Sequence, residues 1–174
     1  MKIFKISTKI PVIKFNYLNE EHLIHFENEI KLHVGPLDYK TNVKGQMTSY
    51  THFLNNTRFN LFLNFFAQKI FETLKNNDPL YLKNFNSLKV INAWGNKLNP
   101  GEVVNPHTHI GSVDYSSVLY FSDTYLVVEN QKIYAERGDI LTFFCTSKHW
   151  TDKAETERIT LAFNWQNATP NKIG

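Results

Sequence analysis

Cysteine is nearly absent from the sequence. Cys145 is the only cysteine in 174 residues, which excludes an internal disulfide and any cysteine-rich zinc or iron–sulfur site. A metal would therefore need histidine and carboxylate ligands. No apolar run approaches the roughly 20 residues of a membrane span, and the N-terminal residues alternate in polarity instead of forming a signal-peptide core. These absences predict a cytoplasmic globular protein without membrane contact.

Arginine is scarce as well, although the chain is mildly basic. The net charge is +3, and three of the 19 basic residues are arginine. The abundant Asn, Lys, Ile and Phe have A/T-rich codons, so the basicity reflects codon usage. No three consecutive residues are Lys or Arg, and no basic helix face is visible. The composition therefore gives no indication of nucleic-acid binding.

The length and a 42% hydrophobic content predict one domain, residues 1–174, with a substantial core. Residues 1–87 combine two short strands, 2–7 and 11–15, with two helices. Asn19 is placed to cap the first helix, and Gly35-Pro36 to end it. The second helix, 57–75, has an apolar stripe of helical period that predicts a core face. The polar segment 38–49 between the helices is a candidate lid.

From about residue 88 the pattern changes to short strands. Alternating or apolar segments separated by turn residues are predicted at 88–94, 103–109, 116–121, 125–128, 132–135, 139–144 and 157–165. Glu129-Asn130-Gln131-Lys132 suits a hairpin turn. Many evenly spaced short strands favour a sandwich or barrel, against which the helices would pack.

Seven histidines are the main candidates for metal chemistry. Four of them (His22, His25, His33 and His52) lie in the helical half, and we interpret them as ordinary side chains because no carboxylate or cysteine accompanies them at ligand spacing. His107 and His109 stand two apart at the end of a predicted strand, where side chains share a face and could converge on one metal. His149 could be brought to them across a β fold. The alternative is that these histidines only decorate the mouth of a sandwich.

Arg158 stands inside an otherwise apolar strand. Alternation places Arg158 and Thr160 on one face and Ile159 on the other. A buried guanidinium needs an anionic partner, and its planar fork suits a carboxylate. The alternative partner is a local acid, Glu155 or Glu157.

The ordered set of these motifs resembles the 2-oxoglutarate/Fe(II)-dependent oxygenases. More narrowly it is similar to small members with the layout WxN, HxH, SGVYY, GD, FPS, H and RISISFN. The matching pieces are INAWGN at 91–96, HTH at 107–109, SSVLYF at 116–121, RGDILTFF at 137–144, His149, RIT at 158–160 and Phe163-Asn164. The resemblance covers about residues 88–166. It implies a mostly β, α+β fold: a cupin-like jelly roll, or double-stranded β-helix, forms the catalytic core, and the N-terminal helices pack outside it.

The resemblance also implies roles for individual residues. His107 and His149 would be iron ligands. Arg158 would bind the distal carboxylate of 2-oxoglutarate, assisted by the Thr160 hydroxyl and by Tyr120, for which a plain core role is the alternative. The expected pocket residues are Asn92, Trp94, Asn96 and Asn164, and a plain core role is the alternative for Trp94.

One position departs from the family pattern. The usual ligand set is two histidines and a carboxylate, in an HxD or HxE motif, but His109 stands in the carboxylate's place. His109 could be a ligand itself, which is the reading we favour. Alternatively, Asp114 could swing in to supply the carboxylate, or His109 could lie behind the ligands.

The resulting hypothesis is a dioxygenase that uses Fe(II), O₂ and 2-oxoglutarate and releases succinate and CO₂. A peptide side chain, a nucleobase and a small metabolite all remain open as the substrate. The alternatives are a cupin-like three-histidine metalloenzyme that uses no 2-oxoglutarate and a non-enzymatic jelly-roll module.

Overall fold

The fold is taken from a computed structural model, which describes residues 2–5, 11–36, 41–77, 87–111 and 113–168. Parts of three predicted segments fall outside these ranges: residues 6–7 of the first strand, residues 38–40 of the candidate lid, and Asp78-Pro79 after the second helix. Among the described residues, no helix is both long and apolar enough to cross a bilayer.

Two helices and a series of short strands make up the described chain. The helices are α1 (Glu20–His33) and α2 (Thr57–Asn77). The strands are β1 (Lys2–Lys5), β2 (Pro11–Asn16), β3 (Val43–Lys44), β4 (Gln46–Met47), β5 (Ser87–Leu98), β6 (Val103–Val104), β7 (Tyr115–Tyr120), β8 (Thr124–Val128), β9 (Gln131–Ala135), β10 (Asp139–Phe144), β11 (His149–Trp150) and β12 (Arg158–Ala168).

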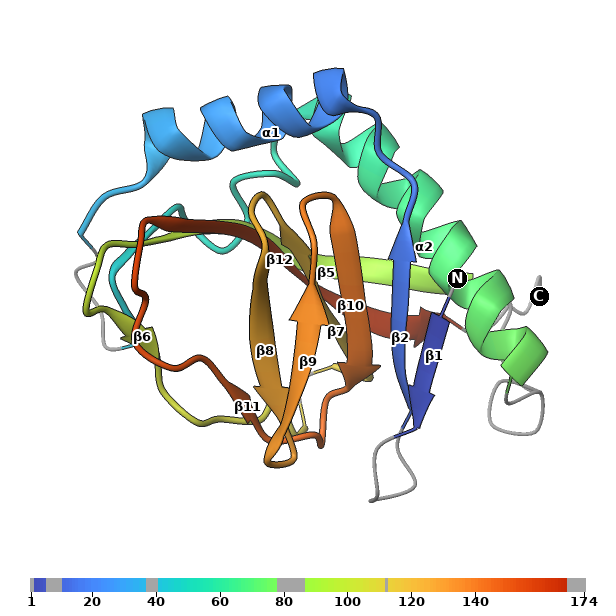
Figure 1. The fold of residues 1–174 in the computed structure, drawn as a ribbon. Helices are drawn as coiled ribbons and strands as arrows, with labels where there is room; N and C mark the ends of the chain where they lie inside the picture. The colour runs from blue at the N-terminus through green and yellow to red at the C-terminus, as the bar shows by residue number, and fades with distance from the viewer. Residues whose placement is uncertain (1, 6–10, 37–40, 78–86, 112, 169–174) are drawn as a thin grey trace.

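The strands form two facing sheets. The larger sheet has the order β1-β2-β10-β7-β12-β5-β4, and the smaller has the order β11-β8-β9. A short β3-β6 pair lies to one side (Figure 1). A cluster of buried side chains from both sheets, including Tyr120, Leu126 and Leu141, fills part of the space between them. The predicted jelly roll, or double-stranded β-helix, is confirmed.

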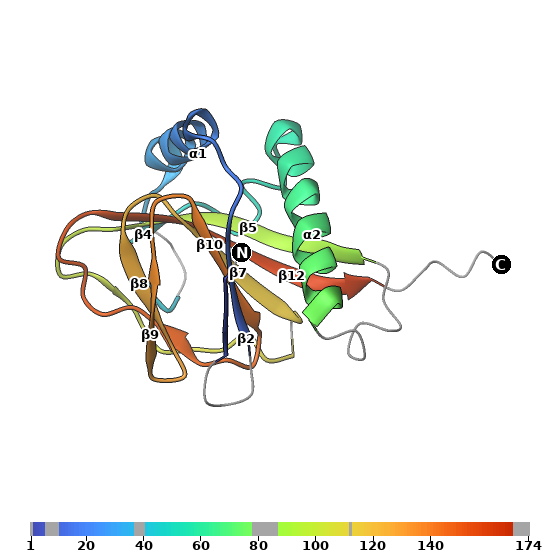
Figure 2. The same cartoon turned by 45° about the vertical axis from the view of Figure 1, so that its right-hand side comes forward.

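Both helices cover the outer face of the seven-stranded sheet, as predicted (Figure 2). The Asn19 side chain accepts a hydrogen bond of 2.9 Å from the His22 amide and so caps α1. The apolar stripe of α2 packs onto the sheet, with Leu63, Phe66 and Ile70 completely buried. The helices and the sheet therefore share one core, which holds the strands of the pocket in place from outside.

Some strand predictions need correction. The strand predicted over 103–109 ends at Val104, because Pro106 has no amide hydrogen to continue a ladder. Part of the predicted polar lid instead forms β3 and β4. A hairpin turn is present in the predicted segment, but it is shorter, because Gln131 and Lys132 already belong to β9. Its two central residues, Glu129 and Asn130, both have positive φ, as a type I′ turn requires.

Candidate metal centre and pocket

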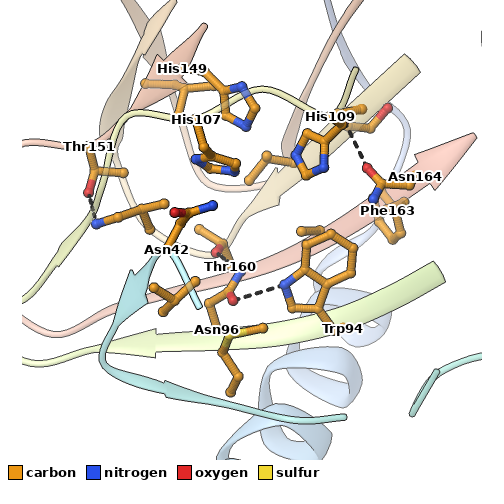
Figure 3. A pocket seen from close by; sticks show the side chains of 18 of the residues that line it. Asn42, Trp94, Asn96, His107, His109, His149, Thr151, Thr160, Phe163 and Asn164 are labelled. Atoms are coloured by element: carbon orange, nitrogen blue, oxygen red, sulfur yellow. Dashed lines mark hydrogen bonds between the residues drawn. The ribbon is translucent and has the colours of Figure 1, made fainter. Parts of the chain in front are cut away.

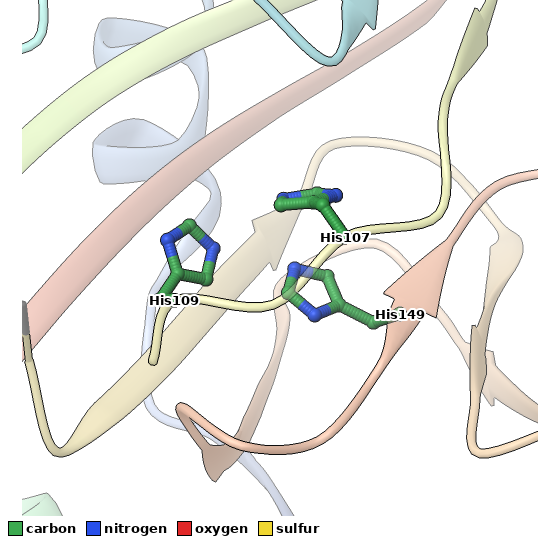
Figure 4. Close-up of side chains that lie close together, drawn as sticks. All are labelled: His107, His109 and His149. Atoms are coloured by element: carbon green, nitrogen blue, oxygen red, sulfur yellow. The ribbon is translucent and has the colours of Figure 1, made fainter. Parts of the chain in front are cut away.

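Three imidazoles, two from the loop after β6 and one from β11, lie close together. His107, His109 and His149 can each place one ring nitrogen within 4.8 Å of the other two. Figure 4 shows His107 and His109 on one loop and His149 on β11, with their rings gathered together. The ring centroids of His107 and His149 are 4.2 Å apart. A group of this kind can hold a metal through nitrogen ligands alone.

Backbone pairing, rather than a continuous strand, brings these histidines together. His107 and His149 form an isolated antiparallel bridge, with N···O distances of 3.1 and 3.0 Å. The His109 amide donates to the carbonyl oxygen of Cys145 at 2.9 Å. The expectation that HxH lies on a strand end is therefore wrong, and two separate contacts to the 145–149 segment position the two rings.

The protein also fixes which ring nitrogen is available. The Nδ1 of His107 lies 2.8 Å from the Asn105 carbonyl oxygen, and the Nδ1 of His149 lies 3.0 Å from the Ser147 carbonyl oxygen. A carbonyl can only accept, so Nδ1 carries the proton in both rings. Each Nε2 therefore has a free lone pair, which is the usual arrangement behind a metal-bound histidine.

Burial keeps the three rings uncharged. Burial, helped by the neighbouring His107, lowers the pKa of His149 to about 3. Burial and His107 likewise lower the pKa of His109 to about 4. The pKa of His107 is lowered by burial, partly offset by the bond to Asn105. Neutral imidazole is the form that binds a metal, so the site needs no deprotonation near pH 7.

The histidines line a cavity of about 350 Å³ between the two sheets. Arg158 and Thr160 point into it from β12, and Tyr120, which pairs with Thr160 across the ladder, points into it from β7. The predicted alternation along β12 is present, since Ile159 and Leu161 pack on the opposite face among the helices. One cavity thus holds both the histidines and the arginine singled out in the sequence.

Two buried polar atoms in this cavity have no hydrogen-bond partner among the described residues. They are Nη1 of Arg158 and the hydroxyl oxygen of Tyr120. Their residues are only 9% and 1% exposed. The alternative partner Glu157 instead pairs with Lys97 at 3.0 Å. A buried guanidinium nitrogen and a buried hydroxyl that line one cavity and have no acceptor among the described residues suit a bound anion, which would supply one.

Burial also raises the pKa of Tyr120 well above its usual value, against the opposing effect of the Arg158 charge. The phenol therefore keeps its proton throughout the physiological range. It can only act here as a neutral hydroxyl, which is suited to donating a hydrogen bond to an anion.

A chain of amides and hydroxyls forms one wall of the cavity (Figure 3). Trp94 Nε1 donates to Asn96 Oδ1 at 3.1 Å, and Asn96 Nδ2 donates to Thr160 Oγ1 at 3.3 Å. Elsewhere in the cavity lining, Asn164 Nδ2 donates to Asn92 Oδ1 at 3.0 Å. All four predicted pocket residues thus line the cavity, and their hydrogen bonds hold this wall in a fixed arrangement.

Asp114 lies apart from the histidine cluster. Its carboxylate oxygen accepts a 2.7 Å hydrogen bond from the Asn167 amide, and its backbone amide donates to the Trp165 carbonyl oxygen. In this arrangement Asp114 fastens the loop before β7 to the end of β12. The cluster that the structure assembles consists of three histidines.

Several other residues that line the cavity come from a segment without a site motif. Asn42, Val43 and Met47 reach the cavity from the segment of β3 and β4, and Tyr50 from the turn after it. In the sequence, this segment is recognisable only as part of the polar stretch 38–49, which we interpret as a candidate lid. It forms a wall of the cavity.

Comparison with known proteins gives a clear result only for the fold. No protein-family model matches the sequence, and no curated protein does. A solved oxidoreductase of the 2OG-Fe(II) oxygenase family from Burkholderia pseudomallei is similar in structure, with a TM-score of 0.65 at 10% identity over 91% of this chain and 86% of that one. The chain has the fold of the 2-oxoglutarate/Fe(II)-dependent oxygenases.

Two further structures of this fold were solved with ligands. The viral collagen prolyl hydroxylase of Paramecium Bursaria Chlorella virus-1, in a complex with 2OG, has a TM-score of 0.62 at 11% identity, covering 91% of this chain and 96% of that one. HygX from Streptomyces hygroscopicus, with nickel and 2-oxoglutarate bound, has a TM-score of 0.56 at 12% identity, covering 92% and 83%. The resemblance read from the motifs is confirmed at the level of the fold.

Proposed function

We propose that the protein is a 2-oxoglutarate- and Fe(II)-dependent dioxygenase. The observation that carries the proposal is the content of the cavity: three uncharged histidines together with a buried arginine whose Nη1 has no partner among the described residues. The first group is suited to a divalent metal, and the second to a carboxylate. A cosubstrate that chelates a metal at one end and carries a carboxylate at the other satisfies both.

The residues present suit iron. His107, His109 and His149 would hold it, with the Nε2 atoms of His107 and His149 presented by their bonds to backbone carbonyls. When bound, Fe(II) with O₂ supplies an oxidation of the substrate that is coupled to decarboxylation of 2-oxoglutarate to succinate. The protein's own part is to bind, orient and exclude water.

Arg158, Tyr120 and Thr160 would hold the distal carboxylate of 2-oxoglutarate. The guanidinium supplies charge and at least one free N–H, and the phenol supplies a second donor. Thr160 accepts a hydrogen bond from Asn96, so its own hydroxyl proton is free to point at the carboxylate. Binding would thus satisfy the two buried polar atoms that lack a partner among the described residues.

The third histidine changes the charge of the site. A carboxylate in the place of His109 would cancel one of the two positive charges of Fe(II), whereas a neutral imidazole cancels none. We expect His109 to strengthen the attraction for the dianionic cosubstrate and to weaken retention of the metal. Similarity to folds solved with 2OG, or with nickel and 2-oxoglutarate, supports the same ligands here.

Turnover of the cosubstrate tests this proposal without knowledge of the substrate. We expect the purified chain with Fe(II), ascorbate, O₂ and 2-oxoglutarate to release succinate, slowly while no substrate is present. Candidate peptides, nucleosides and small metabolites are then screened for faster release. The His149→Ala variant should form none. If the protein binds iron but releases no succinate with any candidate substrate, the result would favour the cupin-like metalloenzyme.

A further inference from the structure

A second group of potential metal ligands lies at the C-terminal end of α1, away from the cavity. Glu29, His33 and His52 can each place one ligand atom within 4.8 Å of the other two. His52 Nε2 is 2.9 Å from Glu29 Oε1, and His33 Nδ1 is 3.3 Å from the same oxygen. None of the three lines the cavity.

Both parts of this cluster are held by the fold. Glu29 and His33 are four residues apart on α1 and share one face of the helix. His52 comes from the turn after β4, and its ring packs edge-on against completely buried Phe53 at 5.0 Å between centroids. The rings of His33 and His52 are 4.7 Å apart. The cluster therefore joins a helix end to a loop.

The surroundings favour a cation. The last turn of a helix carries the negative end of its dipole, and the Glu29 carboxylate adds a negative charge. The nearby Lys31 ammonium is engaged by Glu27 at 2.7 Å. Among the described residues, the ion-pair partners found for Glu29 are the two histidines. No described lysine or arginine thus neutralises the carboxylate.

We infer that Glu29, His33 and His52 form a second divalent-metal site, whose ligand set favours Zn²⁺. Two imidazoles and one carboxylate are a common zinc ligand set, with a fourth position left to water. Ligand atoms about 2.0–2.1 Å from a tetrahedral zinc ion lie about 3.3 Å from each other. The 2.9 Å between Glu29 Oε1 and His52 Nε2 is slightly shorter than that value. His33 Nδ1 donates to the Glu29 carbonyl oxygen at 2.9 Å, so Nε2 of His33 is the ring nitrogen left to bind the metal.

Zinc at this position would act on the cavity through Tyr50. The turn that carries His52 also carries Tyr50, whose ring packs edge-on against Trp94 at 5.0 Å and lines the cavity. The metal would fasten this turn to α1 and so steady one wall of the pocket. The site does not depend on the proposed oxygenase reaction.

Zinc binding to the full-length chain tests the site. All zinc measurements use a His107→Ala/His149→Ala variant as the parent protein, because it keeps only His109 of the three histidines in the cavity. Equilibrium dialysis against Zn²⁺ should give one zinc per chain, and zinc should slow amide exchange in residues 50–55. Adding either Glu29→Gln or His52→Asn should weaken zinc binding at least tenfold. A matched control, His22→Asn, changes an exposed histidine at the other end of the same helix and should leave binding unchanged.

Two results would overturn the inference. One is a parent protein that binds no zinc although its circular dichroism matches that of the unmodified chain. The other is zinc binding that survives both Glu29→Gln and His52→Asn. Because Glu29→Gln preserves the size of the side chain, it keeps the inference testable if the His52→Asn variant fails to fold.

Discussion

The two faces of the seven-stranded sheet differ in whether contacts within the protein satisfy their side chains. Along β12, Ile159, Leu161 and Trp165 point outward into the apolar core beneath the helices, where the chain supplies all of its own contacts. Arg158 and Thr160 alternate with them and point into the cavity. On that face the chain leaves a guanidinium nitrogen and, on the next strand, the Tyr120 hydroxyl without described partners.

This difference shows how a single strand can serve both stability and binding. The outward face contributes hydrophobic burial that does not need a ligand. The inward face holds polar groups whose desolvation is offset only when something binds. Substitutions on the outward face should therefore lower stability, and substitutions on the inward face should lower ligand affinity.

Leu161→Ala should produce the largest change. Leu161 is 0% exposed in the core beneath the helices, so we expect the free energy of unfolding to fall by about 3–4 kcal/mol. Urea denaturation measures this fall. Binding of 2-oxoglutarate by the folded fraction should stay within threefold of the original. A larger loss of affinity in protein that is still folded would show that the two faces are not separable.

The inward face should also make stability depend on pH. Burial lowers the pKa of His149 to about 3 in the folded chain, against about 6.5 when unfolded. Below pH 6.5 the unfolded chain therefore binds more protons, so the stabilisation is fully present above pH 6.5 and is lost as the pH falls toward 3. In the metal-free protein this amounts to roughly 3 kcal/mol between pH 7 and pH 4.5.

A comparison with His149→Gln isolates that contribution from the carboxylates of the chain. Urea denaturation at the two pH values should show a steeper loss for the unmodified protein than for the variant. Equal losses in both proteins would mean that His149 is not held in its neutral form by burial.

Arg158→Met should separate binding from stability most sharply. Without the guanidinium, the dissociation constant for 2-oxoglutarate should rise at least a hundredfold, which is about 2.7 kcal/mol. The free energy of unfolding should stay the same or rise, because the substitution removes a buried charge whose Nη1 has no partner among the described residues. Calorimetry with the Ni²⁺-loaded protein measures the affinity. Arg158→Lys, which keeps the charge but not the planar fork, should give an intermediate loss.

Tyr120→Phe should have the smallest effect. The hydroxyl is one uncharged donor among several, so we expect the 2-oxoglutarate affinity to fall about fivefold to tenfold. Stability should not fall, since the oxygen removed has no partner among the described residues. A variant less stable by more than about 1 kcal/mol would show that the hydroxyl has a structural role instead.

Much of this arrangement could be predicted from the sequence because it depends on local period. The alternation of Arg158, Thr160 and their neighbours gave the two faces of β12, and the stripe on the second helix gave its core side. The shortest elements escaped prediction. Strands of two residues, such as β3, β4 and β11, carry no period, and partners distant in sequence determine their pairing.

Contacts between distant residues limited the prediction of sites in the same way. The sequence favours ordinary roles for His33 and His52, because no carboxylate accompanies them at a recognised ligand spacing. Glu29 in fact lies within 3.3 Å of both histidines. The four-residue spacing of Glu29 and His33 on a helix predicts that they lie close together. The position of His52 beside them depends on how the loop folds, which the sequence does not indicate. Similarly, the HxH pair converges through its bridge to the His149 segment, not through strand geometry.

The most direct measurement is an anaerobic titration of the protein with Fe(II) and 2-oxoglutarate, followed by visible absorption. Our account predicts a metal-to-ligand charge-transfer band at one equivalent of iron. The band should be absent in His149→Ala and should need at least a hundredfold more 2-oxoglutarate in Arg158→Met. Iron that binds without producing the band at any 2-oxoglutarate concentration would contradict the account.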